Sequence, residues 1–223
     1  PFWWKRQPYI AAVSVKRYDD SAALLSAFET RDIDALATRI CTASLSRKLA
    51  DRSTLDYATN VYECLVPNTA TGLLSDSEIR RALMYAVDRS TLAASIYQEM
   101  VQLSEVPVPP GTWLNESQST TYYYSPERAL QILYAMGWSD SDQNGILDRL
   151  QDGLIQEFTI NIITYEEPTR STRRDAARLI AEQLRRIGIA VTVEVKTRDG
   201  VRNALRADTF DLALVAYNLS DYP

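Results

Sequence analysis

The chain has 223 residues, of which 46% are apolar and 24% are charged, and its formal net charge is −5. These proportions are typical of globular proteins, and the negative charge argues against a nucleic-acid-binding surface, which needs clustered Lys and Arg. The sequence contains no histidine, which excludes the usual Ser-His and Cys-His catalytic pairs and the commonest zinc ligand.

The first seventy residues are predicted to alternate between strands and a helix. Asp19 or Asp20 supplies an N-cap for the helix, and the strands show apolar residues at every second position. Pro67 and Gly72 punctuate the chain and place a segment boundary near residue 70. The predicted elements are a strand over 10–18, a helix over 21–30, and strands over 32–36 and 57–67.

The middle of the chain is predicted to be helical, with a Pro-rich extended segment between the helices. Ser75 or Asp76 caps the first helix, and Ser90 or Thr91 begins the second. The third has Ser125 as its N-cap, a proline in its first turn and a glycine at its C-terminal end. The predicted elements are helices over 75–88, 90–100 and 125–137, with the extended segment over 106–113.

The last third predicts strand, helix, strand, helix, strand, which favours an α/β sheet with right-handed crossovers. The first helix carries several arginines mixed with acids, a pattern that favours a solvated face. The predicted strands cover 157–165, 189–196 and 210–217, and the helices cover 171–188 and 198–207. The arginines assigned to the solvated face are Arg170, Arg173, Arg174, Arg178, Arg185 and Arg186.

Residues 138–148 (WSDSDQNGILD) resemble the start of an EF-hand calcium loop. Asp140, Asp142 and Asn144 occupy ligand positions, and Asp148 falls at position nine. Position twelve, which should be a bidentate Glu, is Gln151, and a strand follows where a second helix is expected. The pattern therefore favours a structural turn whose acids bind their own backbone, with a weak calcium site as the alternative.

Asp221 stands just beyond the last predicted strand, where α/β sheets place ligand-contacting loops. Beside Tyr217 and Asn218 it could hold a cation, although the local sequence alone favours a solvated loop residue. No nucleophile–base pair can be named, so we expect no enzymatic activity and no cofactor. Cys41 and Cys64 lack metal-site spacing; a disulfide between them and two free thiols are both open.

The segments taken together resemble the family-5 extracellular solute-binding proteins of ABC importers. VPNTATGLLSDSEIRRALMYAVDRSTL resembles the family signature "N-T … D-x-x-V-R-x-A-(L/I)-x-x-A-I-D-R". YYYSPERALQILYAMGWSDSDQNGILD and FDLALVAYNLSDYP resemble its "Y-D-P … A-G-W-x-D-x-D-G-D-G-I" and "F-D-L … W-x-x-D-Y-P" segments. The residues that carry the first match are Asn68, Asp76, Arg80, Ala82, Ala86, Asp88 and Arg89.

The resemblance implies a partial periplasmic-binding-protein type II fold, a mixed β-sheet lobe flanked by helices. Residues 1–70 would be part of lobe I leading into the crossover, and residues 71–223 would be most of lobe II. The sequence begins without Met or a signal-peptide pattern and ends just after a strand. We therefore expect a fragment of a longer protein, exported as a lipoprotein or free in the periplasm.

The resemblance also implies a function, the capture of oligopeptides in an interlobe cleft for delivery to membrane permease subunits. Asp221 matches the residue that pairs with the peptide ammonium, and Tyr217, Asn218, Leu219 and Ser220 would form one wall. The family's aromatic usually stands three residues before the Asp, a place held here by Asn218. A metal chelate or a sugar is therefore an alternative ligand. The rival functions are a sensing module of the same fold and a calcium-dependent structural domain.

Overall fold

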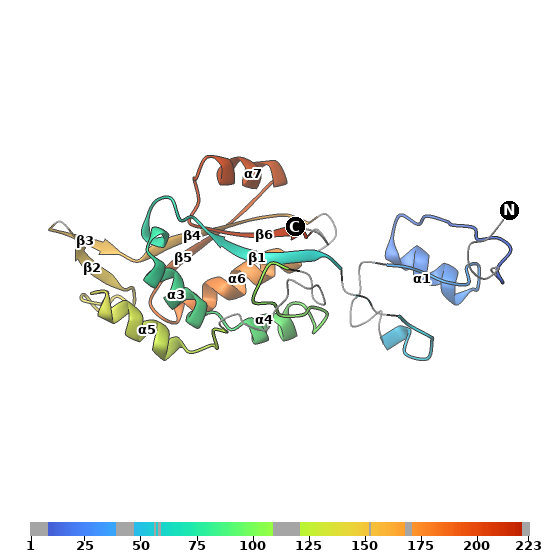
Figure 1. Ribbon diagram of the computed structural model, residues 1–223, viewed down its shortest axis with the longest axis horizontal. Coiled ribbons are helices and arrows are strands. Elements are labelled where there is room, and N and C mark those ends of the chain that lie inside the picture. The colour runs from blue at the N-terminus through green and yellow to red at the C-terminus, as the bar shows by residue number, and fades with distance from the viewer. Residues whose placement is uncertain are drawn as a thin grey trace. The chain divides into compact units, whose positions relative to one another are not determined.

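The computed structural model describes residues 9–38, 47–55, 57, 59–108, 121–151, 153–167 and 171–219 (Figure 1). The chain divides into two compact units, Pro1–Thr54 and Leu55–Pro223. This division lies before the boundary predicted near residue 70, so that the first strand of the sheet belongs to the second unit. The assignment of the two parts of the chain to two lobes stays a prediction.

The first unit contains helix α1 (Ser21–Glu29), which confirms the predicted helix. Its N-cap is Asp20, whose Oδ1 accepts a hydrogen bond from the Ala23 N–H at 2.7 Å. The predicted strands over 10–18 and 32–36 are wrong, because these segments have no strand structure. Val13 and Val15 are 77% and 90% exposed. Alternating apolar residues favour a strand only where a neighbouring strand supplies hydrogen-bond partners.

The second unit is built on a four-stranded sheet with the order β1-β6-β4-β5. β4 runs parallel to β5 and β6, whereas β1 pairs antiparallel with β6 along its whole length. The predicted alternation of strands and helices is therefore confirmed, and with it the α/β class. The strands are β1 (Val61–Pro67), β4 (Thr159–Tyr165), β5 (Ala190–Lys196) and β6 (Leu212–Asn218).

Four helices of the second unit, α3, α4, α5 and α7, begin at a residue whose side chain accepts a hydrogen bond from an N–H of the first turn. Asp76 caps α3, Asp88 caps α4, and Ser125 caps α5 before a proline in the first turn. The cap of α4 is thus Asp88, where the sequence had suggested a start at Ser90 or Thr91. The helices are η1 (Leu73–Ser75), α3 (Ser77–Ala86), α4 (Arg89–Ser95), α5 (Pro126–Ala135), α6 (Thr172–Arg185) and α7 (Arg198–Arg206).

The sheet separates two hydrophobic clusters. Ile160 and Ile162 of β4 face the larger one, which also contains the buried side chains of α3, α5 and α6. Ile163 faces the smaller one, formed with Val201 and Ala204 of α7. Figure 1 shows α7 above the strands and α3, α5 and α6 below them. None of the helices in the described part of the chain combines the length and apolar character that crossing a bilayer requires.

A small hairpin, β2 (Asp148–Gln151) and β3 (Leu154–Glu157), was not predicted. It changes the predicted strand over 157–165, because β3 ends at Glu157 and the new strand β4 begins at Thr159. Phe158 lies between them, fully buried, and its N–H donates to the Leu147 carbonyl at 2.7 Å. The continuous run of β-forming residues concealed this break.

Candidate functional site

The three parallel strands of the sheet end at the same edge. β4 ends at Tyr165, β5 at Lys196 and β6 at Asn218, and the antiparallel β1 begins there with Val61. The loops beyond the carboxyl ends of parallel strands are the usual place for ligands in α/β sheets. We therefore take this carboxyl edge as the candidate functional site.

The end of β6 holds the part of the predicted site that the structure describes. Tyr217 lies opposite Tyr62 of β1 and is 46% exposed. Partial burial and, to a smaller extent, the charge of the nearby Cys64 raise the pKa of the Tyr217 hydroxyl. The Leu219 N–H donates to the Asn60 carbonyl at 2.7 Å, which continues the β1–β6 pairing past the last residue of the strand.

The two remaining residues of the predicted site, Ser220 and Asp221, lie outside the described residues. The role predicted for Asp221 therefore stays a prediction. Cys41 also lies outside them, whereas Cys64 is a half-buried free cysteine in β1. Burial, and then the charge of Glu63, raises the pKa of the Cys64 thiol.

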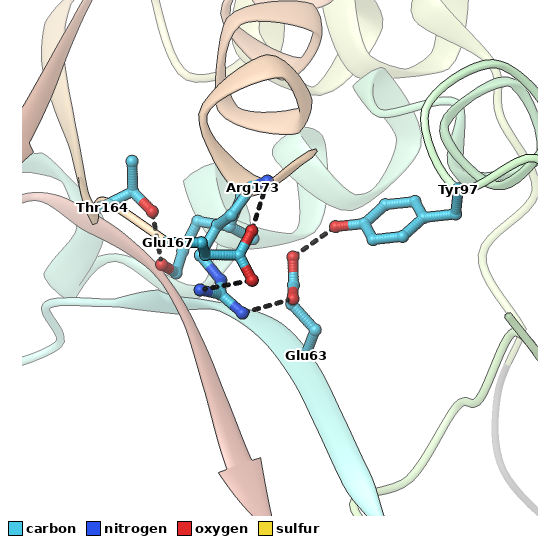
Figure 2. Close-up of polar contacts among 6 residues, drawn as sticks. Glu63, Tyr97, Thr164, Glu167 and Arg173 are labelled. Carbon is cyan, nitrogen blue, oxygen red and sulfur yellow. Dashed lines mark hydrogen bonds and ion pairs between the residues drawn. The ribbon is translucent and has the colours of Figure 1, made fainter. Parts of the chain in front are cut away.

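A polar cluster around the buried Arg173 lies at the carboxyl edge on the α6 side of the sheet; we call Glu63, Tyr97, Glu167 and Arg173 the edge cluster (Figure 2). The Arg173 Nη2 lies 2.9 Å from the Glu63 Oε2, and its Nη1 lies 3.5 Å from the Glu167 Oε1. The Tyr97 hydroxyl donates to the other oxygen of Glu63. Arg173 is only 5% exposed, so the two carboxylates balance a buried charge.

The electrostatics of the edge cluster fix its protonation. Burial opposes the charge of the Arg173 guanidinium, but the Glu63 and Glu167 carboxylates outweigh it and raise the pKa of Arg173. Burial and the Glu63 charge raise the pKa of Tyr97, so its hydroxyl keeps its proton and donates. Arg173 therefore stays charged and Tyr97 stays protonated within the cluster. Its members come from β1, the segment after α4, the loop after β4, and α6.

Tyr165, the last residue of β4, packs against the edge cluster. The Arg173 guanidinium lies 4.3 Å from the Tyr165 ring centroid, and that of Arg198, the first residue of α7, lies 5.1 Å away. Cation–π contacts of this kind hold the guanidinium over the ring face. The aromatic ring thus joins the edge cluster to the start of α7.

The edge cluster corrects one prediction from the sequence. Arg173 was assigned to a solvated face of α6 but is buried, whereas Arg178 of the same helix is exposed. Arg173 stands three residues before Ala176 and four before Ala177, both of which are buried. This helical spacing was the available signal that Arg173 points inward.

The loop that resembles a calcium site is satisfied by its own backbone, as predicted. The carboxylate of Asp140 accepts the N–H groups of Asn144 and Gly145, each at 3.0 Å, and Asp142 accepts that of Asn144 at 3.2 Å. Asp148 is buried and accepts from the backbone and the hydroxyl of Ser141. One oxygen each from Asp140, Asp142 and Asp148 lies within 4.8 Å of the others. The geometry is that of a turn.

An open groove of about 610 Å³ lies at the opposite, amino edge of the sheet. Its lining includes Thr159 at the start of β4, Asp211 just before β6, and residues of the hairpin, of η1 and of the start of α3. The Asp211 carboxylate accepts the Asn161 N–H at 2.8 Å. Tyr217, Asn218 and Leu219, the predicted ligand-binding residues that the structure describes, are not among the residues that line this groove.

The chain is similar to a known protein family and to two characterised proteins. The family described as "Bacterial extracellular solute-binding proteins, family 5 Middle" matches residues 1–223. The oligopeptide-binding protein AppA of Bacillus subtilis is 23% identical over 225 residues, 99% of this chain and 40% of that protein. Heme-binding protein A of Haemophilus influenzae is 32% identical over 71 residues, 32% of this chain and 13% of that protein.

Two solved structures show a similar arrangement of elements. AppA of Bacillus subtilis in complex with a nonapeptide has a TM-score of 0.66 at 22% identity, over 92% of this chain and 40% of that one. NikA from Brucella suis in complex with Fe(III)-EDTA has a TM-score of 0.74 at 20% identity, over 96% of this chain and 43% of that one. The chain thus spans about 40% of the length of AppA.

Proposed function

Because the chain belongs to family 5 of the bacterial extracellular solute-binding proteins, we propose that it is part of an ABC-importer subunit that captures oligopeptides. The family match over residues 1–223 carries this proposal and confirms the resemblance found in the sequence. The likeness to AppA and NikA confirms the predicted α/β fold of periplasmic binding proteins. Capture itself belongs to a longer protein, outside the cell or in the periplasm, which delivers the peptide to membrane permease subunits.

The carboxyl edge supports peptide capture on physical grounds. A peptide that lies along an exposed strand end or loop gains main-chain hydrogen bonds whatever its side chains, which gives affinity without strict selectivity. The half-exposed Tyr217 offers a ring surface beside the exit of β6. In the proposal, Asp221 follows at this exit and pairs with the peptide ammonium, a charged hydrogen bond that strengthens when lobes exclude water.

The ligand class is tested with the full-length protein that carries this chain. Native mass spectrometry identifies what the purified protein carries, and calorimetry compares peptides of two to nine residues with Fe(III)-EDTA and a mannohexaose. Saturable peptide binding supports the proposal. Binding of the chelate or the sugar alone would replace the peptide with another solute, and no binding of any of the three would refute solute capture by this site.

The role of Asp221 is tested by pairing a protein change with a ligand change. Asp221→Ala should weaken peptide binding by about 2–5 kcal/mol, the range for unpairing a buried charge. N-acetylation of the peptide, which removes the ammonium, should weaken binding to the wild type but not further to the variant. Asp142→Ala, in the exposed turn, is the control and should bind like the wild type. Equal affinity of wild type and Asp221→Ala would refute the assignment.

A further inference from the structure

We propose that Arg173 is a positioning residue for the carboxyl edge: through the edge cluster it fixes the first residues of β1, and thereby the exit of β6 at which the proposed ligand is held. This inference rests on the proposed function only for the identity of the ligand. Arg173 is 5% exposed, and its Nη2 and Nη1 form ion pairs with the carboxylates of Glu63 and Glu167 within the protein.

The first step is the link from α6 to β1. Arg173 and Glu63 are 110 residues apart in the sequence, and their contact at 2.9 Å joins the second residue of α6 to the third residue of β1. Within the described part of the chain, β1 lies at the edge of the sheet and pairs with β6 alone. The start of β1 is therefore held by the Arg173–Glu63 ion pair and by the hydrogen bond from the Tyr97 hydroxyl to Glu63.

The second step is the link from β1 to the exit of β6. Glu63 lies opposite Ala216, and Asn60, just before β1, accepts the Leu219 N–H at 2.7 Å. An edge strand frays from its ends unless side chains anchor it. Loss of the anchor at Glu63 would therefore release the Leu219 hydrogen bond first, and the main chain of 217–219 would lose its fixed place.

The third step is the choice of arginine. The two ends of one guanidinium reach Glu63 and Glu167 in different directions, while its face covers the Tyr165 ring at 4.3 Å. Glu167 belongs to the loop after β4 and Glu63 to the start of β1, so a single side chain relates the exit of β4 to the start of β1, which pairs with the end of β6. Lysine carries the charge at one point and lacks the planar fork, so it cannot make all three contacts.

The test compares Arg173→Lys with the matched change Arg178→Lys in the full-length protein; the Arg178 side chain is 61% exposed on the same helix. Hydrogen–deuterium exchange at 60–63 and at 216–219 is the readout that needs no ligand. Arg173→Lys should speed exchange at both segments, including the Leu219 amide, and Arg178→Lys should not. Unchanged exchange in Arg173→Lys would overturn the proposal.

Peptide affinity separates positioning from simple stabilisation. Arg173→Lys should lower affinity about tenfold, which equals about 1.4 kcal/mol at 25 °C, while Arg178→Lys stays at the wild-type value. A neutral variant, Glu63→Gln with Glu167→Gln and Arg173→Met, removes every charge of the edge cluster. Its thermal stability should be higher than that of Arg173→Met alone, but its peptide affinity should stay below the wild-type value. Recovery of affinity in this neutral variant would refute positioning by Arg173.

The two proposals fail in distinguishable ways. If the wild type binds no peptide, the proposed function fails, and the exchange comparison still decides the role of Arg173. If the wild type binds peptide and Arg173→Lys changes neither exchange nor affinity, the positioning role fails and the proposed function stands.

Discussion

Two regions of this chain gather carboxylates, and they do so for different reasons. In the turn at 140–148, the exposed acids Asp140 and Asp142 accept backbone N–H groups of residues at most five positions away. In the edge cluster, Glu63 is bound by side chains 34 and 110 residues away. The bonds of these two acids therefore stabilise the local conformation of the turn, whereas the edge cluster constrains how distant elements meet.

The largest effect is expected in the edge cluster. Arg173→Met leaves Glu63 and Glu167 facing each other without a cation, and should lower the free energy of unfolding by about 3 kcal/mol, the low end of the range because both carboxylates keep some contact with water. Denaturant titration measures the change. Arg178→Met, at an exposed position, is the control. A loss no larger than that of the control would remove the distinction between the two regions.

A smaller effect is expected from the one buried acid of the turn. Asp148 is 4% exposed and accepts from the backbone and hydroxyl of Ser141. Asp148→Ala leaves the Ser141 N–H without its partner and should lower the free energy of unfolding by about 2 kcal/mol. Asp142→Ala, exposed in the same turn, should cost about 1 kcal/mol or less. Equal losses would show that burial does not distinguish these acids.

The alkaline limb of the stability curve tests the proton on Tyr97. Its pKa is raised above the ordinary value of 10.0 by burial and by Glu63, so its contribution is complete below pH 10 and is lost as the pH rises beyond it. From pH 10 to 11 the wild type should lose up to about 1.4 kcal/mol more than Tyr97→Phe. Tyr134→Phe, 55% exposed, should keep the wild-type slope; if Tyr97→Phe does so too, Tyr97 is not held protonated.

The contrast also explains what the sequence could predict. Helix α5 was predicted because Ser125, Pro126 and Gly137 act within their own turns. The hydrogen bonds of Asp140 and Asp142 to the backbone were predicted for the same reason, since the N–H donors and the carboxylate acceptors lie within one turn. The alternation of β4, α6, β5, α7 and β6 follows from local periodicity, and it was correct.

The edge cluster could not be predicted in the same way. Glu63 and Arg173 become partners only when β1 pairs with β6 and α6 packs on the sheet, and no local spacing records that meeting. The strand predicted over 10–18 was wrong for a related reason: the alternation of apolar residues is local, but a strand also needs a neighbouring strand, and no described strand pairs with this segment. Asp221 was assigned through the family resemblance and lies outside the described residues.

The smallest effect is expected from calcium, and it sharpens the account of the turn. Its acids already accept N–H groups, and Gln151 offers no carboxylate at position twelve. We therefore expect a dissociation constant above 1 mM, so that calcium at about 1 mM stabilises the protein by about 0.4 kcal/mol or less. Thermal unfolding with calcium, with magnesium and with a chelator measures this. A stabilisation by calcium alone that Asp140→Asn abolishes would make the turn a metal site, and the backbone bonds of Asp140 would then compete with the ion.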